Sequence, residues 1–451
     1  MKKNGYVRNA LLCKVNKSEV SMIFTFLSIA IGIYAFFDFK KAIQLFTIYQ
    51  IIWYPTVLLS IGSVSLGTNS VIPLLFAILF FFKRHQFNPA TKFPFTVPFV
   101  LIILSYLFSC FTALSGFFPE FSRSLMRIFS VYIYVYILWN VIETDEDFVF
   151  IFKGTTYLIF ISCIYGIIEY VTGNNFVLDY KINLSGNTIE TYEGYTLRGY
   201  RLTSLFEHPI GAGMTFGLYS IFTLSLFFNK ASLKFQSNLA IITAILCIPL
   251  IILTKMRTPI LFTIIASAIL VKLSRFVRRK TVLLVVVFFM ALVPILAIVI
   301  SSNSALLTNL FSTGKSAEIG GSSLEMRLNQ MVAIQEIVSS SPIFGLGETF
   351  RNSIVKNGLT NAALGFEGVI FEQWSMHGVF GLVATAILIY TSVIKLPLMY
   401  RTKEVAILSL AYWVAYIVSS LPSFRIVFYY LFIFYFIKQS EIYRNRRSSI
   451  I

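Results

Sequence analysis

Long apolar segments recur along almost the whole chain, and they limit its possible folds more than any other feature. Each runs for about 17–25 residues, the length that an α-helix needs to cross the hydrocarbon core of a bilayer. Hydrophobic residues make up 57% of the sequence and charged residues only 13%. Soluble globular domains do not have this composition. We therefore predict an all-α polytopic membrane protein that folds as one integral membrane domain over residues 1–451.

The apolar segments predict thirteen candidate helices. Their expected ranges are 20–37, 43–61, 67–82, 95–115, 121–140, 149–172, 208–228, 236–254, 259–273, 281–300, 366–393, 404–420 and 423–437. Basic loops orient them, because cytoplasmic loops carry an excess of Lys and Arg. The basic segments lie at 83–85, 229–234, 275–280, 395–403 and 444–447. All five fall on one side if every helix between them crosses, which also explains the net charge of +17 without nucleic acid as a partner.

The amino terminus does not fit an odd number of crossings. Thirteen crossings with a cytoplasmic carboxyl tail would put the basic residues 2–17 outside, against the positive-inside rule. We therefore expect about twelve transmembrane helices (12–13), with both termini inside. One segment between residues 20 and 82 would then be half-inserted, or two of them would form one broken helix. The four cysteines are scattered and show no metal or disulfide spacing.

One long polar stretch interrupts the apolar pattern. This large outer loop covers residues 301–365, and the same orientation places a second outer loop at 173–206. Within the large loop, Ser322 and Glu325 form a capping-box pattern that starts a helix. Apolar residues follow at helical spacing until Pro342 and the glycines after it. We predict a short amphipathic helix that lies on the outer membrane surface and covers a site.

Three polar clusters fall on the outer side, at 197–211, 254–259 and 301–367. The helices expected to start near these clusters run inward, so their amino termini present unpaired N–H groups and a partial positive charge outside. Arg201 and Arg257 stand beside two such starts, and a planar guanidinium binds two phosphate oxygens at once. The pattern predicts an anion site sized for a phosphate or diphosphate.

The arginines also have structural interpretations. Arg201 could form a loop ion pair with Glu193 or Glu207. Arg257 could be a topology charge, although an outer arginine runs against the positive-inside rule. Arg327 could be a solvated charge on the surface helix.

The other titratable candidates also have functional and structural interpretations. His208 could cap its helix or take part in chemistry. Glu367 begins a helix, where a carboxylate is favourable in any case, and Glu372 lies further in. Glu169 could be a buried pairing partner for one of the arginines, and His377 is expected to be structural.

These motifs together resemble the O-antigen ligase/polymerase superfamily, the Wzy-like polysaccharide polymerases and their ligase relatives, over roughly residues 150–440. The matching motifs are Arg201 with His208-Pro209, Thr254 to Thr258, Arg327 with Pro342 to Gly347, and Gly378 to Gly381. Ligases of the superfamily carry His-Asn about eleven residues before the Gly378 position, where this chain has Glu367-Gly368. Polymerases often have an acidic residue there, which favours a polymerase.

The resemblance implies a multi-pass glycosyltransferase of the bacterial cytoplasmic (inner) membrane. It would join undecaprenyl-diphosphate-linked repeat units at the outer face, for O-antigen, capsule or exopolysaccharide. No metal and no cofactor would be needed. Partners would be the lipid-linked glycan donor and acceptor, the bilayer, and a chain-length regulator and flippase.

The resemblance also implies roles for the candidate residues. An acceptor hydroxyl would attack the anomeric carbon, and lipid diphosphate would leave. The residues expected at the diphosphate are Arg201, Arg257 and Arg327, with Arg198 and Arg351 as secondary candidates. Glu367 would accept the proton of the attacking hydroxyl, and His208 is the alternative base.

Two other functions stay open. A ligase of the same superfamily would pass the finished glycan to a different acceptor. A lipid-linked oligosaccharide flippase would belong to another class, and it should show internal two-fold similarity and charges deep within several helices. We see neither of these features in the sequence. A structural protein would leave the outer arginines without a purpose.

Overall fold

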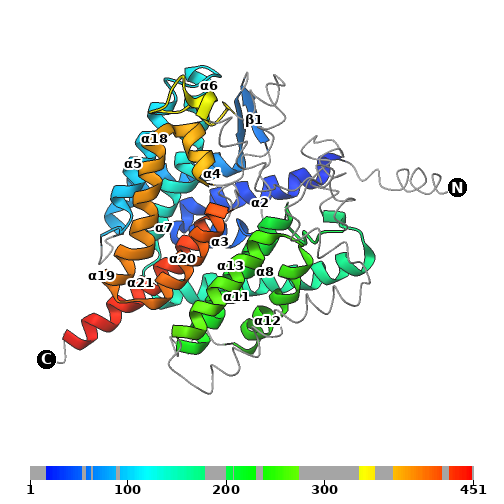
Figure 1. Cartoon of the computed structure of the whole chain (residues 1–451). Helices are drawn as coiled ribbons and strands as arrows, with labels where there is room; N and C mark the ends of the chain where they lie inside the picture. Colours follow the sequence, from blue (N-terminus) through cyan, green and yellow to red (C-terminus); the bar gives the residue numbers. More distant parts are fainter. Residues whose placement is uncertain are drawn as a thin grey trace, which may run out of the picture.

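The computed structural model describes residues 17–52, 57–61, 64–87, 92–177, 200–206, 208–229, 237–273, 335–350, 369–418 and 426–448. Within these ranges the elements are helices, apart from one antiparallel two-stranded hairpin (Figure 1). The elements are α2 (Lys17–Phe37), α3 (Phe39–Tyr49), β1 (Val57–Ile61), β2 (Val64–Gly67), α4 (Thr68–Lys83), η1 (Arg84–Gln86), α5 (Thr96–Ser109), α6 (Phe117–Arg127), η2 (Ile128–Ile133), α7 (Tyr134–Val141), α8 (Asp145–Thr172), α11 (Pro209–Asn229), α12 (Asn238–Leu253), α13 (Arg257–Leu273), α18 (Val369–Tyr390), η5 (Thr391–Lys395), α19 (Leu396–Tyr400), α20 (Lys403–Val418) and α21 (Ile426–Ser448).

Four helical segments in the described part are long and apolar enough to cross a membrane. They are Phe117–Val141, Asp145–Thr172, Pro209–Phe227 and Val369–Tyr400. Shorter apolar helices cover Thr25–Phe37, Thr96–Ser109, Asn238–Leu253 and Thr258–Leu270. The helical membrane character expected from the sequence is therefore present, and the count of about twelve crossings stays a prediction.

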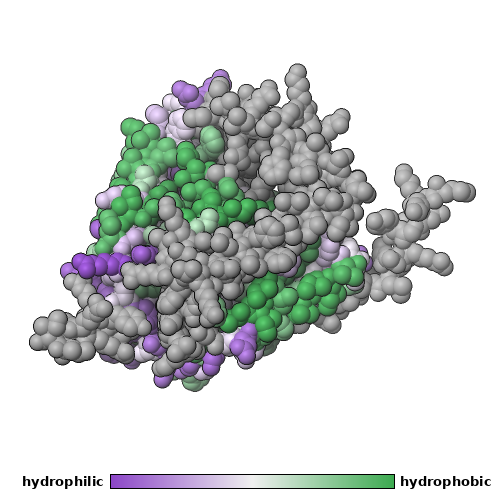
Figure 2. Space-filling model, turned by 60° about the horizontal axis from the view of Figure 1, so that its bottom comes forward, coloured by the Kyte–Doolittle hydropathy of each residue, from purple (hydrophilic) through white to green (hydrophobic). Residues whose placement is uncertain are grey.

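Apolar side chains cover much of the outer surface of these helices. On α5 the exposed positions are Val97, Val100, Leu104 and Phe108. On α8 they are Tyr157, Ile161, Ile164 and Ile168. Residues three or four apart share one helix face, so each set forms an outward apolar stripe. Figure 2 shows extended hydrophobic areas on the described surface, with hydrophilic residues near their edges. Such faces are stable against lipid and unfavourable in water.

The predicted helix at 43–61 is wrong. The helical backbone is interrupted at Asp38, which caps the start of a new helix, α3. The Asp38 side chain accepts a hydrogen bond from Lys41 N at 2.9 Å. At 1.5 Å per residue, the 11 residues of α3 span about 16 Å, half the hydrocarbon core of about 30 Å. The hairpin β1–β2 follows, with Val57 paired to Gly67. The apolar sequence after α3 contains Pro55, which cannot continue a helix.

The centre of the bundle is aromatic. The ring of Phe222 on α11 stacks on Phe432 of α21, with centroids 3.9 Å apart. Helix α20 contacts α13 on one side and α18 on the other. Helices α13 and α18 are therefore connected through a single helix.

Helix α18 is broken at Gly378, which has φ 62° and ψ −160°. The segment 341–347 fills the break (yellow and orange near the top of Figure 1). Val379 N donates to Pro342 O at 2.9 Å, and Leu346 N donates to Ser375 O at 2.9 Å. Irregular backbone beside apolar helices is stable only when its polar groups are paired in this way. The two glycine motifs of the sequence thus form one structural unit.

Candidate functional site

The segment 200–206 brings Arg201 to the turn between α12 and α13. Leu202 N donates to Leu253 O at 3.1 Å, and Arg201 Nη1 lies 3.8 Å from the Met256 sulfur. Helices α11 and α13 begin side by side, because a Cβ atom on Gly213 would lie only 2.6 Å from Cγ of Pro259. Arg201 therefore lies near two helix amino termini, which carry partial positive charge.

Positive charge is concentrated at this place. Burial, and then the charge of Arg201, lower the pKa of Lys255 below its usual value. Desolvation and the same charge lower the pKa of His208 to about 4, although part of the ring is exposed. Burial is the larger cause for both groups, and the second cause shows that the positive charge of Arg201 acts on both side chains. We call Arg201, His208, Lys255 and the starts of α11 and α13 the cationic corner.

His208 also has the structural role that its position allows. Its Nδ1 accepts a hydrogen bond from Ile210 N at 3.2 Å, at the first turn of α11. This contact requires a neutral ring with an unprotonated Nδ1, in keeping with its low pKa. His208 therefore caps the helix, and its role as a base stays a prediction.

Glu169, near the end of α8, binds the Tyr200 side chain before Arg201 and the backbone after it. Its carboxylate accepts hydrogen bonds from Tyr200 OH (2.9 Å), Thr203 N (3.0 Å), Thr203 Oγ1 (3.1 Å) and Ser204 N (2.6 Å). The side chain of Glu169 is only 1% exposed, and Ser204 has φ 52°. A buried carboxylate with several donors is a rigid anchor. The sequence singled out Glu169 as an arginine partner, and these contacts give it a positioning role.

We expect Glu169→Ala to destabilise the protein by about 3 kcal/mol or more, because the donors of Tyr200, Thr203 and Ser204 would lose a charged acceptor. Thermal unfolding in detergent measures this effect. Glu146→Ala is the matched control, since Glu146 is exposed on the same helix. Equal melting temperatures for the Glu169 variant and wild type would contradict the anchoring role.

Several predicted site residues lie wholly or partly outside the described residues. These are Arg198, Arg327, Arg351 and Glu367; for Arg257, only the backbone at the start of α13 is described. Most of the predicted amphipathic loop helix and the predicted helix at 281–300 also lie outside. Of the large outer loop, the structure describes only residues 335–350, which begin with a helical turn at 335–338.

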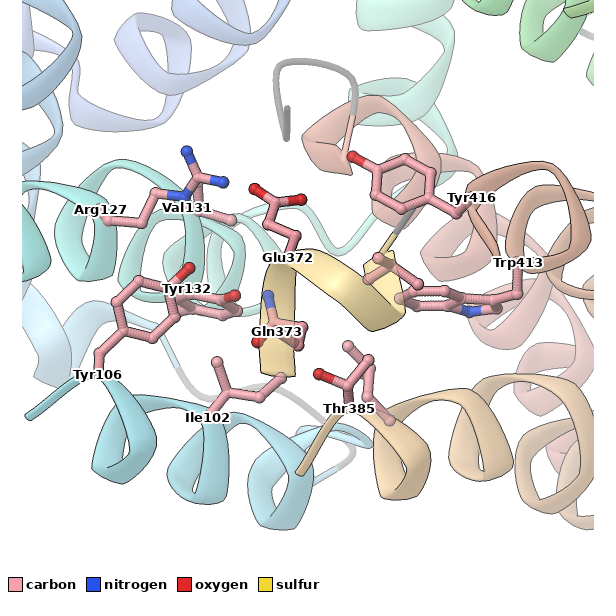
Figure 3. Close-up of a pocket in the computed structure, with 12 residues that line it drawn as sticks. Ile102, Tyr106, Arg127, Val131, Tyr132, Glu372, Gln373, Thr385, Trp413 and Tyr416 are labelled. Carbon is pink, nitrogen blue, oxygen red and sulfur yellow. The ribbon is translucent and has the colours of Figure 1, made fainter. Parts of the chain in front are cut away.

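A second polar site lies between α5, the junction of α6 and η2, α18 and α20, and we call it the Arg127 pocket. It contains about 500 Å³ of space with its open mouth included. Figure 3 shows the Arg127 guanidinium and the Glu372 carboxylate facing one another. Trp413 and Tyr416 lie on the opposite side. The pocket also contains Tyr106, Tyr132, Gln373 and Thr385.

The segment 341–350 contributes a second carboxylate beside Arg127. Glu348 Oε1 lies 3.7 Å from Arg127 Nε. Glu120 holds this segment in place by accepting hydrogen bonds from Glu348 N and, at 2.9 Å, from Thr349 N. Burial raises the pKa of Glu348, and the Arg127 charge opposes this effect. The ion pair therefore joins the loop to the third turn of a candidate membrane span.

His377 supports one wall of this pocket. It is completely buried, its Nδ1 lies 3.2 Å from Ser109 Oγ, and its ring packs 4.1 Å from that of Tyr106. These contacts agree with the structural role expected from the sequence. Within the described ranges, no three His, Cys, Asp or Glu side chains gather closely enough to hold a metal ion.

Arg127 was not among the residues singled out from the sequence, and Glu372 was only a weaker candidate than Glu367. A signal was available, because Arg127 lies ten residues after the start of the span Phe117–Val141. A charge inside an apolar span is costly and commonly functional. The partner residues could not be found in this way, since Glu348 and Glu372 are distant in sequence.

Comparisons with known proteins give no match. Neither a protein-family model nor a curated protein matches the chain. The cationic corner and the Arg127 pocket are therefore the features from which a function can be inferred.

Proposed function

We propose that this protein is a polysaccharide polymerase, a glycosyltransferase that joins undecaprenyl-diphosphate-linked repeat units at the outer face of the bacterial cytoplasmic membrane. The observation that supports this most is the cationic corner. Arg201, Lys255 and two helix starts lie together there, and Glu169 anchors the segment that carries Arg201. A diphosphate fits such a place through charge and through paired hydrogen bonds to arginine.

The apolar outer faces support a lipid-linked substrate. A polyprenyl tail can lie in the bilayer against stripes like those on α5 and α8 while its diphosphate reaches the cationic corner. A substrate with a polar head and a very long apolar tail requires this combination of surfaces.

The reaction that we propose balances without a cofactor. The acceptor hydroxyl oxygen forms a bond to the anomeric carbon of the donor glycan, and the bond from that carbon to the diphosphate oxygen breaks. The electron pair leaves with the lipid diphosphate, where Arg201 and Lys255 stabilise the charge. Glu367 accepts the hydroxyl proton. Attack opposite the leaving group inverts the anomeric centre.

One observation favours a second candidate, a lipid-linked oligosaccharide flippase. Arg127 lies ten residues inside a candidate membrane span, and charges at such depth are common in transport pathways. A ligase of the same reaction class is the other alternative, because it needs the same diphosphate site.

A deletion strain separates these functions. For a polymerase, we expect single repeat units on the lipid carrier or the final acceptor, and restoration of the polysaccharide ladder by the wild-type gene. Long chains that stay on the carrier would instead indicate a ligase. Accumulation of repeat units on the cytoplasmic face would indicate a flippase and would contradict our proposal.

A further inference from the structure

The Arg127 pocket contains more polar groups than packing requires. The side chains of Arg127 and Glu348 are 25% and 18% exposed, and of these two residues Arg127 lines the pocket. An ion pair beside an apolar bundle has a desolvation cost, and packing contacts alone do not offset this free energy. The arrangement therefore indicates a polar ligand.

The composition of the pocket limits the chemistry of this ligand. Glu348 already pairs with the Arg127 guanidinium, and Glu372 lines the pocket beside it. Two carboxylates around one guanidinium disfavour a phosphate. Carboxylates accept hydrogen bonds from hydroxyl groups, and the Gln373 amide both donates and accepts. A ligand rich in hydroxyl groups fits these partners.

The remaining walls offer aromatic faces and further hydroxyls. Trp413 and Tyr416 lie opposite the Arg127 side of the pocket (Figure 3). Tyr106, Tyr132 and Thr385, which carry hydroxyl groups, also line the pocket. A sugar ring presents hydroxyls at its edge and C–H groups on its face, which matches a polar wall opposite an aromatic one.

We propose that the Arg127 pocket is a carbohydrate subsite that holds a sugar ring of the acceptor glycan. Glu372 and Gln373 bind its hydroxyls, and Trp413 packs against its face. The assignment to the acceptor rests on the polymerase function proposed above. Helix α20 carries Trp413 and also packs against α13, the helix whose start belongs to the cationic corner, so one pair of packed helices links the two sites.

Calorimetric titration of the purified full-length protein in detergent tests this subsite. The probes are free oligosaccharides released by mild acid from the lipid-linked pool of the source cells, and a panel of neutral, N-acetylated and acidic disaccharides. We expect saturable binding by wild type and at least tenfold weaker binding by Glu372→Gln, which keeps size but removes the charge. Trp413→Phe keeps an aromatic face and should bind within a few-fold of wild type. Glu336→Gln, at an exposed position outside the pocket, is the matched control and should bind normally.

Competition with inorganic pyrophosphate separates the two sites. We expect saturating pyrophosphate to leave oligosaccharide binding unchanged, because it occupies the cationic corner. Absence of saturable binding, equal binding by wild type and Glu372→Gln, or displacement by pyrophosphate would overturn the subsite. A protein that binds sugar with the expected variant pattern but transfers none would keep the subsite and overturn only the polymerase function.

Discussion

Replacing Arg201 with alanine should lower the rate of glycan polymerisation by about a hundredfold or more, with the protein still present in the membrane. Arg201 is the arginine of the cationic corner whose side chain the structure describes. Its guanidinium would bind the leaving diphosphate, where negative charge develops. Arg201→Lys keeps the charge but loses the planar fork, so we expect only partial activity. Polysaccharide ladders and lipid-linked repeat units from complemented deletion cells measure the effect.

The matched control for this experiment is Arg84→Ala. Arg84 is an exposed arginine of η1, in a loop expected on the cytoplasmic side, so its loss should leave the ladder unchanged. A normal ladder from the Arg201→Ala strain, at equal protein levels, would show that this guanidinium does not act on the diphosphate.

Gly378→Ala should destabilise the protein far more than a methyl group added at an open glycine position. A Cβ atom at Gly378 would lie 2.3 Å from Ile343 O, and the φ of 62° with ψ −160° is unfavourable for any other residue. Backbone strain and the clash with a backbone atom together cost about 4 kcal/mol or more. We expect a strongly reduced melting temperature in detergent, or failure of the protein to accumulate.

Gly173→Ala isolates the conformational part of this effect. Gly173 has φ 68°, but no atom lies within 4 Å of a Cβ placed there. Gly173→Ala should lower the free energy of unfolding by only about 1 kcal/mol. Similar melting temperatures for the Gly173 and Gly378 variants would contradict the tight fit of the 341–347 segment into the broken helix.

The helix positions could be predicted well from the sequence, because apolar length alone identifies a membrane helix. The helices expected at 149–172, 208–228 and 236–254 correspond closely to α8, α11 and α12. The prediction failed at 43–61, where hydropathy alone does not distinguish a spanning helix from a short helix followed by a hairpin. The proline inside that apolar run was the better guide.

The candidate sites were predictable only in part. The sequence indicated that Arg201 and the turn before α13 belong together, because each stands beside a helix start. It also singled out Pro342 to Gly347, as the end of the loop helix and as one of the matching motifs. It could not show that this segment pairs with Gly378, because the contact depends on two backbone conformations that are far apart in sequence. The charge on Arg127 was visible in the sequence, but its partners become apparent only in three dimensions.

Chain growth by the purified protein is the most direct test of the polymerase function. Wild-type protein and Arg201→Ala would be reconstituted in liposomes with lipid-linked repeat units, without nucleotide and with EDTA present, and the products analysed by mass spectrometry. We expect chains of two or more repeat units on the lipid carrier with wild type and almost none with Arg201→Ala. The polymerase function is contradicted if correctly folded wild-type protein leaves every repeat unit single, or moves the lipid-linked units between leaflets without joining them.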